Sequence, residues 1–170
     1  MTQYNIIAES QEYTVVAEFD HVATPAEAYQ SEADLEKEFI RLLGEQGYEY
    51  LPIHKEADLI FNLRDQLEKL NHYHFTDNEW EHFFNECIAN KNDDIVAKTA
   101  KIQDDYIQVL KRDTGESQNI KLIDKDNIHN NFVQVINQYV EEGGNYDTRY
   151  DVSILVNGLP LVHIELKRRG

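Results

Sequence analysis

The sequence predicts an α+β domain in which helices and strands occupy separate parts of the chain. Apolar residues recur at helical spacing over residues 31–101, and from residue 106 onward the spacing changes to the alternation of β-strands. Helices that precede strands are typical of a helix-plus-sheet, α/β sandwich-like domain and not of regular strand–helix alternation. The chain has 170 residues, enough for one domain with its own core.

Start signals and apolar spacing predict the helices. Ser31 opens a Ser-x-x-Asp pattern and Thr76 opens a Thr-x-x-Glu pattern, and both are typical of a capping box at a helix start. The predicted helices run from Ser31 to Gly44 or Gly47, over 57–71, from Thr76 onward and over 93–101. The side chains expected to be buried are Leu35, Phe39, Leu42, Leu43, Leu59, Leu63, Leu67, Leu70, Trp80, Phe83, Phe84, Cys87 and Ile88.

Turn-forming residues divide the remaining apolar runs into strands. The turn-rich link 113–116 predicts a hairpin, and Asn157-Gly158 is the strongest short hairpin signal in the chain. The run 132–139 is ambiguous between strand and helix, and its β-branched residues favour a strand. The expected strands cover 106–110, 119–123, 132–139, 151–156 and 161–167, and the runs 4–8 and 13–19 predict a small sheet edge or hairpin.

The composition excludes several classes of protein. No run of about 20 apolar residues exists that would span a membrane, and the first residues lack the pattern of a signal peptide. The single cysteine, Cys87, cannot form an internal disulfide and is expected to be a small buried apolar residue. These features predict a cytoplasmic protein without a membrane segment.

Acidic residues outnumber basic residues by 32 to 16, which gives a net charge of −16. Such a domain repels a phosphate backbone at long range, so it is not expected to grip DNA well on its own. Either other parts of a larger protein deliver DNA to it, or DNA is not its ligand. The chain also ends in a basic cluster, 167–170, directly after an expected strand. That ending predicts a fragment of a longer protein.

The most informative residues lie on the last two expected strands. Alternation places Val152, Ile154 and Val156 on one face and leaves acidic and basic side chains on the other. Asp151 and Glu165 could supply the carboxylates, and Leu166 a backbone carbonyl, that Mg²⁺ prefers as ligands. Lys167 could then orient an attacking water molecule and stabilise developing charge. This pattern is typical of metal-dependent hydrolysis of a phosphodiester.

Two carboxylates on adjacent strands share a metal only if they lie on the same face. Asp151 and Glu165 do so only if paired residue numbers add to an even value, and a two-residue turn at Asn157-Gly158 gives an odd value. We therefore expect a three-residue loop, with a bulge and a left-handed Gly158. In that register Asp151 lies opposite His163 and diagonal to Glu165.

The spacing Asp151, a hairpin, then Glu165-x-Lys167 resembles the PD-(D/E)xK nuclease core. The longer string 149–167, with Val156-Asn157-Gly158-Leu159-Pro160-Leu161 inside it, resembles the amino-terminal nuclease region of HsdR, the restriction subunit of type I restriction-modification enzymes. The segments Ser31-Glu32-Ala33-Asp34-Leu35-Glu36 and Gly47-Tyr48 resemble the first helix of that region. The resemblance spans roughly residues 31–167.

This resemblance implies a restriction-endonuclease-like core with a mixed sheet flanked by helices, truncated before its final helix. It implies Mg²⁺-dependent cleavage of double-stranded DNA, with Asp151, Glu165 and Lys167 as catalytic residues and Asp151, Glu165 and Leu166 as metal ligands. Residues 1–170 would be the endonuclease domain fragment of a motor subunit whose helicase-like ATPase domains use ATP elsewhere. The implied partners are a methyltransferase subunit and a specificity subunit.

Several expectations stay open at the level of the sequence. A glutamate of the first helix often completes such sites, and here it is either Glu32 or Glu36. His163 is a neighbour of the site or a packed strand residue, and Arg168 and Arg169 are candidates for phosphate contacts. Tyr150 stands where the family signature has proline, and no Gln-x-x-x-Tyr element or ATP-binding loop occurs, so this piece alone is not assured of cutting DNA.

Two other functions compete with the nuclease. The charge of −16 favours a non-catalytic acidic interaction module that mimics DNA for a basic partner. A standalone repair or recombination nuclease is a third reading, which the family resemblance disfavours.

Overall fold

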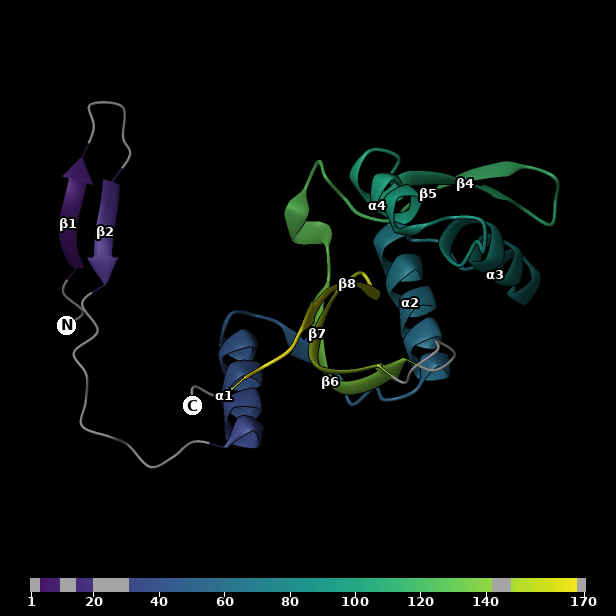
Figure 1. Ribbon diagram of the computed structural model, residues 1–170. Coiled ribbons are helices and arrows are strands. Elements are labelled where there is room, and N and C mark those ends of the chain that lie inside the picture. Colours follow the sequence, from purple (N-terminus) through teal and green to yellow (C-terminus); the bar gives the residue numbers. More distant parts are fainter. Residues whose placement is uncertain (1–3, 10–14, 20–30, 142–147, 168–170) are drawn as a thin grey trace. The chain divides into compact units, whose positions relative to one another are not determined.

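The computed structural model describes residues 4–9, 15–19, 31–141 and 148–167, and the chain divides into two compact units, 1–31 and 32–170. The first unit holds strands β1 (Tyr4–Glu9) and β2 (Val15–Phe19), which pair antiparallel as the two apolar runs predicted. All other elements belong to the second unit, which carries the residues of functional interest (Figure 1).

The second unit is built on a four-stranded mixed sheet. Its strands lie in the order β3-β6-β7-β8, with β3 parallel to β6 and the other pairs antiparallel, which confirms the predicted mixed sheet. The strands are β3 (Glu49–Tyr50), β6 (Val133–Glu141), β7 (Thr148–Val156) and β8 (Leu159–Ile164). The sequence did not predict β3, because two residues are too few to show an alternating pattern.

The predicted helices and the first hairpin of this unit are present, with shifted boundaries. The helices are α1 (Glu32–Glu45), α2 (Glu56–Asn71), α3 (Asp77–Phe83), the π-helix η1 (Phe84–Ile88), α4 (Ile95–Gln103) and the 3₁₀ helix η2 (Ile128–Asn130). The hairpin pairs β4 (Ile107–Lys111) with β5 (Ser117–Lys121). The capping box at Thr76 is confirmed, since Thr76 and Glu79 exchange two hydrogen bonds of 3.1 Å.

Both faces of the sheet are covered by helices, with α1 and α2 on opposite sides (Figure 1). The predicted separation of a core face from a charged face on β7 is therefore wrong: Ser153 and Leu155 are as buried as Val152, while Ile154 and Val156 are half-buried. A helix on each side buries alternate residues of both parities. On α1 the expected buried face is also only partly right. Leu43 is buried against Val135 and Val152, but Leu42 stays 41% exposed.

Helix α2 links the sheet to a second core. Leu59 packs with the sheet residues, whereas Leu63 and Leu67 enter a core of large apolar side chains from α3 and the β4–β5 hairpin. Its buried members are Leu63, Leu67, Phe75, Trp80, Phe83, Leu110, Ile120, Leu122 and Leu159, with Phe84, Cys87 and Ile88 partly buried against them. Because Leu159 is the first residue of β8, this second core holds the turn between β7 and β8.

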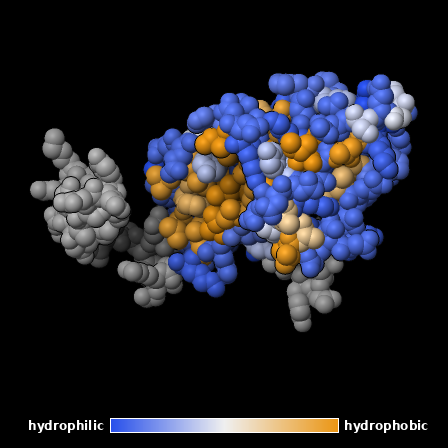
Figure 2. All heavy atoms as spheres, turned by 90° about the horizontal axis from the view of Figure 1, so that it is seen from above, coloured by the Kyte–Doolittle hydropathy of each residue, from blue (hydrophilic) through white to orange (hydrophobic). Residues whose placement is uncertain are grey.

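The surface of the second unit is mostly hydrophilic, and Figure 2 shows orange apolar groups set among blue residues on one face. The most exposed large apolar side chains include Ile95, Phe61 and Val96, at 78%, 74% and 71%. Among the described residues, no helix combines the length and the apolar character that crossing a membrane requires.

Candidate active site

The β7–β8 hairpin turns through only two residues. Val156 pairs with Leu159, and Asn157 and Gly158 both have left-handed backbones, with φ of +51° and +80°. Two positive φ values in succession match the right-handed twist of the strands, and Asn-Gly is the sequence that adopts them most readily. The left-handed Gly158 is confirmed, but the predicted three-residue loop is wrong.

A bulge in β8 restores the parity that the two-residue turn removes. Leu155 pairs with Pro160 and Ile154 with Val162, so Leu161 is an extra residue on the β8 side. Proline has no N–H to donate to a ladder and within sheets is found at edges, strand starts and bulges. The expected bulge is thus present, but it lies in β8 and not in the loop.

Beyond the bulge, paired residue numbers add to an even value. Ser153 lies opposite His163 and Val152 opposite Ile164, which is the last pair of the ladder. The predicted placement of His163 opposite Asp151 is therefore wrong. Extended one residue past Ile164, this register would set Glu165 opposite Asp151. Glu165 lies one residue beyond the last paired residue of β8.

The carboxylate of Asp151 is held by the backbone that follows β8. Its Oδ2 atom accepts a hydrogen bond of 2.7 Å from the backbone N–H of Leu166. The Leu166 side chain is partly buried among Leu43, Val135 and Val152, in the core between α1 and the sheet. This contact ties the end of the Glu165-x-Lys167 segment to the strand that carries Asp151.

Glu165 and Lys167 form an ion pair with each other. The Lys167 Nζ atom lies 3.1 Å from Glu165 Oε1, and the two side chains are 75% and 68% exposed. The sequence predicted both residues within a strand over 161–167. The structure ends β8 at Ile164, so both lie past the regular strand. An extended chain places alternate residues on one side, which is why these two side chains meet.

The structure separates the two candidate glutamates of α1. Glu36 reaches β6, where Oε1 accepts a hydrogen bond of 2.6 Å from Asn137 Nδ2 and Oε2 accepts one from Gln138 Nε2. Glu32 is exposed in the first turn of α1. Of the two, Glu36 is the residue that α1 brings to the sheet.

His163 is packed beside the site. Its ring stacks on Tyr150 with a centroid separation of 3.9 Å and an interplanar angle of 16°, and its Nδ1 atom is 2.8 Å from the hydroxyl of Ser153. Tyr150 directly precedes Asp151, and His163 lies two residues before Glu165. The structure thus shows His163 as a packed strand residue close in sequence to both acids, and its place at a site stays a prediction.

The chemistry of the donor set fits a hard divalent cation. Asp151 and Glu165 offer carboxylate oxygens from neighbouring strands, and a Mg²⁺ site commonly uses one or two carboxylates, with water and substrate oxygens completing the octahedron. Within the part of the chain that the structure describes, no group of three or more His, Cys, Asp and Glu side chains could hold a metal. A site here would thus depend on few protein ligands.

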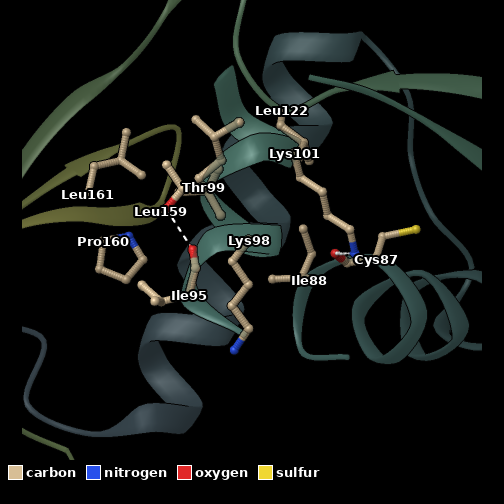
Figure 3. A pocket seen from close by; sticks show the side chains of 11 residues that line it. Cys87, Ile88, Ile95, Lys98, Thr99, Lys101, Leu122, Leu159, Pro160 and Leu161 are labelled. Carbon is tan, nitrogen blue, oxygen red and sulfur yellow. Dashed lines mark hydrogen bonds between the residues drawn. The ribbon is translucent and has the colours of Figure 1, made fainter. Parts of the chain in front are cut away.

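An apolar cavity of about 290 Å³ lies at the other end of the hairpin, between α4, η1 and the start of β8 (Figure 3). Leu159, Pro160 and Leu161 line it from the β8 side, and none of the predicted catalytic residues does. Arg168 and Arg169, the candidates for phosphate contacts, lie outside the described residues.

Sequence reasoning missed the polar residues of β6 and the start of β7. Gln138 joins Glu36 to Arg149, whose Nε donates to Gln138 Oε1, and Asn137 also accepts from the Tyr50 hydroxyl at 2.9 Å. A signal was available, because Asn137 and Gln138 are two adjacent polar residues between the apolar residues Ile136 and Tyr139. On a sheet covered on both faces, such a pair needs partners from the helices.

Comparison of the sequence with known proteins identifies a family. Residues 29–170 match the model described as the type I restriction enzyme R protein N terminus. The chain is 46% identical over 165 residues to the type I restriction enzyme EcoprrI endonuclease subunit of Escherichia coli, covering 96% of this chain and 52% of that protein. It is also similar to two staphylococcal type I restriction enzyme endonuclease subunits.

These are the SsaAORF53P subunit of Staphylococcus saprophyticus, 40% identical over 147 residues, and the SauMSSORF170P subunit of Staphylococcus aureus strain MSSA476, 38% identical over 148 residues. Each match covers 84% of this chain and 15% of the relative. The chain thus spans about half the length of the Escherichia coli relative and a small part of the staphylococcal ones.

Proposed function

The chain belongs to the family of type I restriction enzyme R protein N termini, and from this membership we propose that it is the DNA-cleaving part of a restriction endonuclease subunit. The proposed reaction is the Mg²⁺-dependent hydrolysis of phosphodiester bonds in double-stranded DNA. Asp151, Glu165 and Lys167 are the proposed catalytic residues.

One observation carries this proposal. The bulge at Leu161 gives the β7–β8 ladder an even register, which brings Asp151 and Glu165 opposite each other when it is extended one residue past Ile164, and Lys167 forms an ion pair with Glu165 at 3.1 Å. Two acids and a lysine so arranged match what hydrolysis of an anionic ester requires, namely ligands for a cation and a positive group near the reacting phosphate.

Each residue has a separate task in the proposed reaction. A bound Mg²⁺ supplies charge neutralisation and lowers the pKa of a coordinated water. Asp151 and Glu165 bind the cation, and the backbone carbonyl of Leu166 offers a further oxygen. The N–H of Leu166 orients the Asp151 carboxylate through the 2.7 Å hydrogen bond. Lys167 holds the attacking water and stabilises negative charge on the phosphate.

The charge of the chain bears on how DNA arrives. The net charge of the chain is −16, and Glu36, Asp151 and Glu165 are among its acidic residues. A chain with this charge repels the phosphates of DNA at long range. We propose that ATP-driven domains of the longer subunit deliver the DNA, and that methyltransferase and specificity subunits select the target in the cytoplasm.

The test is DNA cleavage by the full-length subunit in its assembled complex, with the substitutions Asp151→Asn, Glu165→Gln and Lys167→Ala. Each is expected to lower the cleavage rate by at least about a thousandfold while ATP hydrolysis persists. Glu116→Gln is the matched control for Glu165→Gln, because Glu116 is also an exposed glutamate, at 70%, that pairs with a base, Arg112, at 2.9 Å.

The same variants separate the nuclease from the acidic interaction module. The nuclease requires that Asp151→Asn weaken Mn²⁺ binding in calorimetric titration. An interaction module instead predicts unchanged metal affinity, retained cleavage by the complex, and binding to a basic partner that weakens steeply with salt. Retained cleavage in all three variants would contradict the proposed function.

A further inference from the structure

The segment that follows β8 is held to β7 by a side chain and not by the sheet ladder. The last pair of the ladder is Val152 and Ile164. Two residues further along, the backbone N–H of Leu166 donates to Asp151 Oδ2 at 2.7 Å. The carboxylate of Asp151 therefore takes the place of a backbone acceptor, and it holds the chain beside β7 after the ladder has ended.

This hydrogen bond places the Asp151 carboxylate close to the backbone of Glu165. The N atom of Leu166 is bonded to the carbonyl carbon of Glu165, which is bonded in turn to Glu165 Cα. Standard bond lengths then put Asp151 Oδ2 at most about 5.5 Å from that Cα atom. The two acids are thus close in space whatever the pairing of residues beyond Ile164.

The side chain of Leu166 anchors the same segment on its other side. It packs against the core cluster between α1 and the sheet that contains Leu43 and Val152. Exposure alternates along the segment, because Leu166 is half-buried while Glu165 and Lys167 are 68% and 75% exposed. Alternate side chains of an extended chain point to opposite sides, so burial of Leu166 directs Glu165 and Lys167 away from the core.

The Asp151 carboxylate keeps an oxygen for a cation while it holds Leu166. An ionised carboxylate accepts at both of its oxygens, and the bond to Leu166 uses Oδ2. Mg²⁺ sites commonly use one or two carboxylates, so Asp151 and Glu165 suffice without a third acid. The N–H of Leu166 would then fix the direction in which Asp151 presents its second oxygen.

We propose that Leu166 is a positioning residue of the nuclease site, whose anchored side chain sets its N–H against Asp151 and so holds that carboxylate beside Glu165 and Lys167. The proposal rests on the proposed nuclease function. The Leu166 side chain touches neither the cation nor the DNA. It acts through Asp151, and this role is separate from the backbone carbonyl that Leu166 would offer to the metal.

The first experiment measures hydrogen–deuterium exchange of the segment that contains Leu166, by mass spectrometry of the metal-free full-length subunit. Asp151→Ala removes the acceptor, and Leu166→Ala removes the anchor, so each is expected to speed exchange at least about tenfold. Asp151→Asn keeps an oxygen that accepts the N–H, and its exchange is expected to stay within about twofold of the wild type.

The second experiment measures Mn²⁺ affinity by calorimetric titration of the same subunit. Leu166→Ala is expected to weaken binding about tenfold, as the loss of groups that orient metal ligands commonly does. Leu166→Met, which nearly keeps the volume of the side chain, is expected to restore the affinity to within about twofold of the wild type.

Ile40→Ala is the matched control, because Ile40 is also a half-buried aliphatic residue of this core but lies on α1. It is expected to leave both exchange at Leu166 and Mn²⁺ affinity unchanged. A purely structural role of Leu166 would lower the urea midpoint of Leu166→Ala and Ile40→Ala alike without changing either Mn²⁺ affinity, and that result would overturn the proposal.

The two experiments separate this inference from the proposed function. If Asp151→Asn loses Mn²⁺ binding while Leu166→Ala matches the wild type in exchange and affinity, only this inference is wrong. If Asp151→Ala exchanges no faster than the wild type, the hydrogen bond does not hold the segment and the positioning role is also wrong. If Asp151→Asn binds Mn²⁺ like the wild type, the proposed function and this inference are both wrong.

Discussion

The two ends of the β7–β8 hairpin are held in very different ways. At the turn end, Asn157 is fully buried, and its side chain bonds to the Leu122 carbonyl at 3.0 Å, to Asn131 Oδ1 at 2.8 Å and to the Phe132 N–H at 2.9 Å. Gly158 lies against the backbone of Leu63 in α2. Every polar group of the Asn157 side chain therefore has a partner inside the protein.

The open end carries the candidate catalytic residues and has fewer such contacts. The Asp151 carboxylate accepts one backbone hydrogen bond, from Leu166, and Glu165 and Lys167 are mostly exposed and pair with each other. An exposed ion pair contributes little to stability, commonly less than about 1 kcal/mol.

This difference indicates that the two ends of the hairpin have different roles. The turn end fixes the register, and with it the bulge that gives the ladder near Asp151 its even parity. The open end keeps its charged groups accessible, as a site for a cation and a phosphate requires. Substitutions at the turn should therefore change the free energy of unfolding, and substitutions at the open end should change activity alone.

The largest effect on stability is expected for Gly158→Ala. A Cβ at this position would lie 2.6 Å from Leu63 Cα, and φ is +80°. Overpacking costs about 1–3 kcal/mol and left-handed backbone about 1–2 kcal/mol, so we expect a loss of about 3 kcal/mol in the free energy of unfolding. Urea denaturation measures it.

Gly115→Ala is the matched control for this substitution. Gly115 also has a positive φ, +87°, but a Cβ there would meet nothing within 4 Å. Only the backbone contribution should remain, about 1 kcal/mol. Equal losses at Gly158 and Gly115 would show that the packing of the turn against α2 contributes nothing.

A pH-dependent effect is expected from Asp124, which belongs to the loop that binds Asn157. Hydrogen bonds from Asn130 Nδ2 at 2.9 Å and the Asn127 N–H at 3.0 Å lower the pKa of Asp124, and Lys121 lowers it further. A depressed folded-state pKa stabilises the protein above the unfolded value and loses that contribution as pH falls through the folded-state value.

Asp124→Asn should therefore destabilise the protein at neutral pH, and the difference from the wild type should shrink as pH falls below about 4. Urea denaturation at pH 7, 5 and 3 measures this difference. Asp126→Asn, at a position 79% exposed, is the comparison variant and is expected to differ little from the wild type at each pH. A difference for Asp124→Asn that is independent of pH would contradict the assignment of the shift.

The smallest effect on stability is expected at the open end. Glu165→Gln and Lys167→Ala break an ion pair between two side chains that are more than two-thirds exposed, so each should change the free energy of unfolding by less than about 0.5 kcal/mol. Urea denaturation of the variants used for the cleavage test measures this. A loss of 2 kcal/mol or more would make the open end structural and end the contrast between the two ends.

Much of the local structure could be predicted from the sequence. The Thr76 box, the leucines of α2 and the Asn157-Gly158 turn depend on neighbours within a few residues, and each is present in the structure. The parity argument was correct in requiring an even register, but it assigned the extra residue to the loop. Pro160, which cannot donate to a ladder, was the signal for a bulge inside β8.

For the candidate site, too, some features follow from the sequence and others only from the tertiary structure. The sequence alone determined the candidates for the proposed chemistry, Asp151, Glu165 and Lys167, because residue type and spacing along two strands are local properties. Only the tertiary structure decided that Glu36 and not Glu32 reaches the sheet, that Gln138 links it to Arg149, and that both faces of β7 are buried. These outcomes depend on how α1 and α2 pack on β6 and β7, and contacts between residues about 100 positions apart leave no periodic signal in the chain.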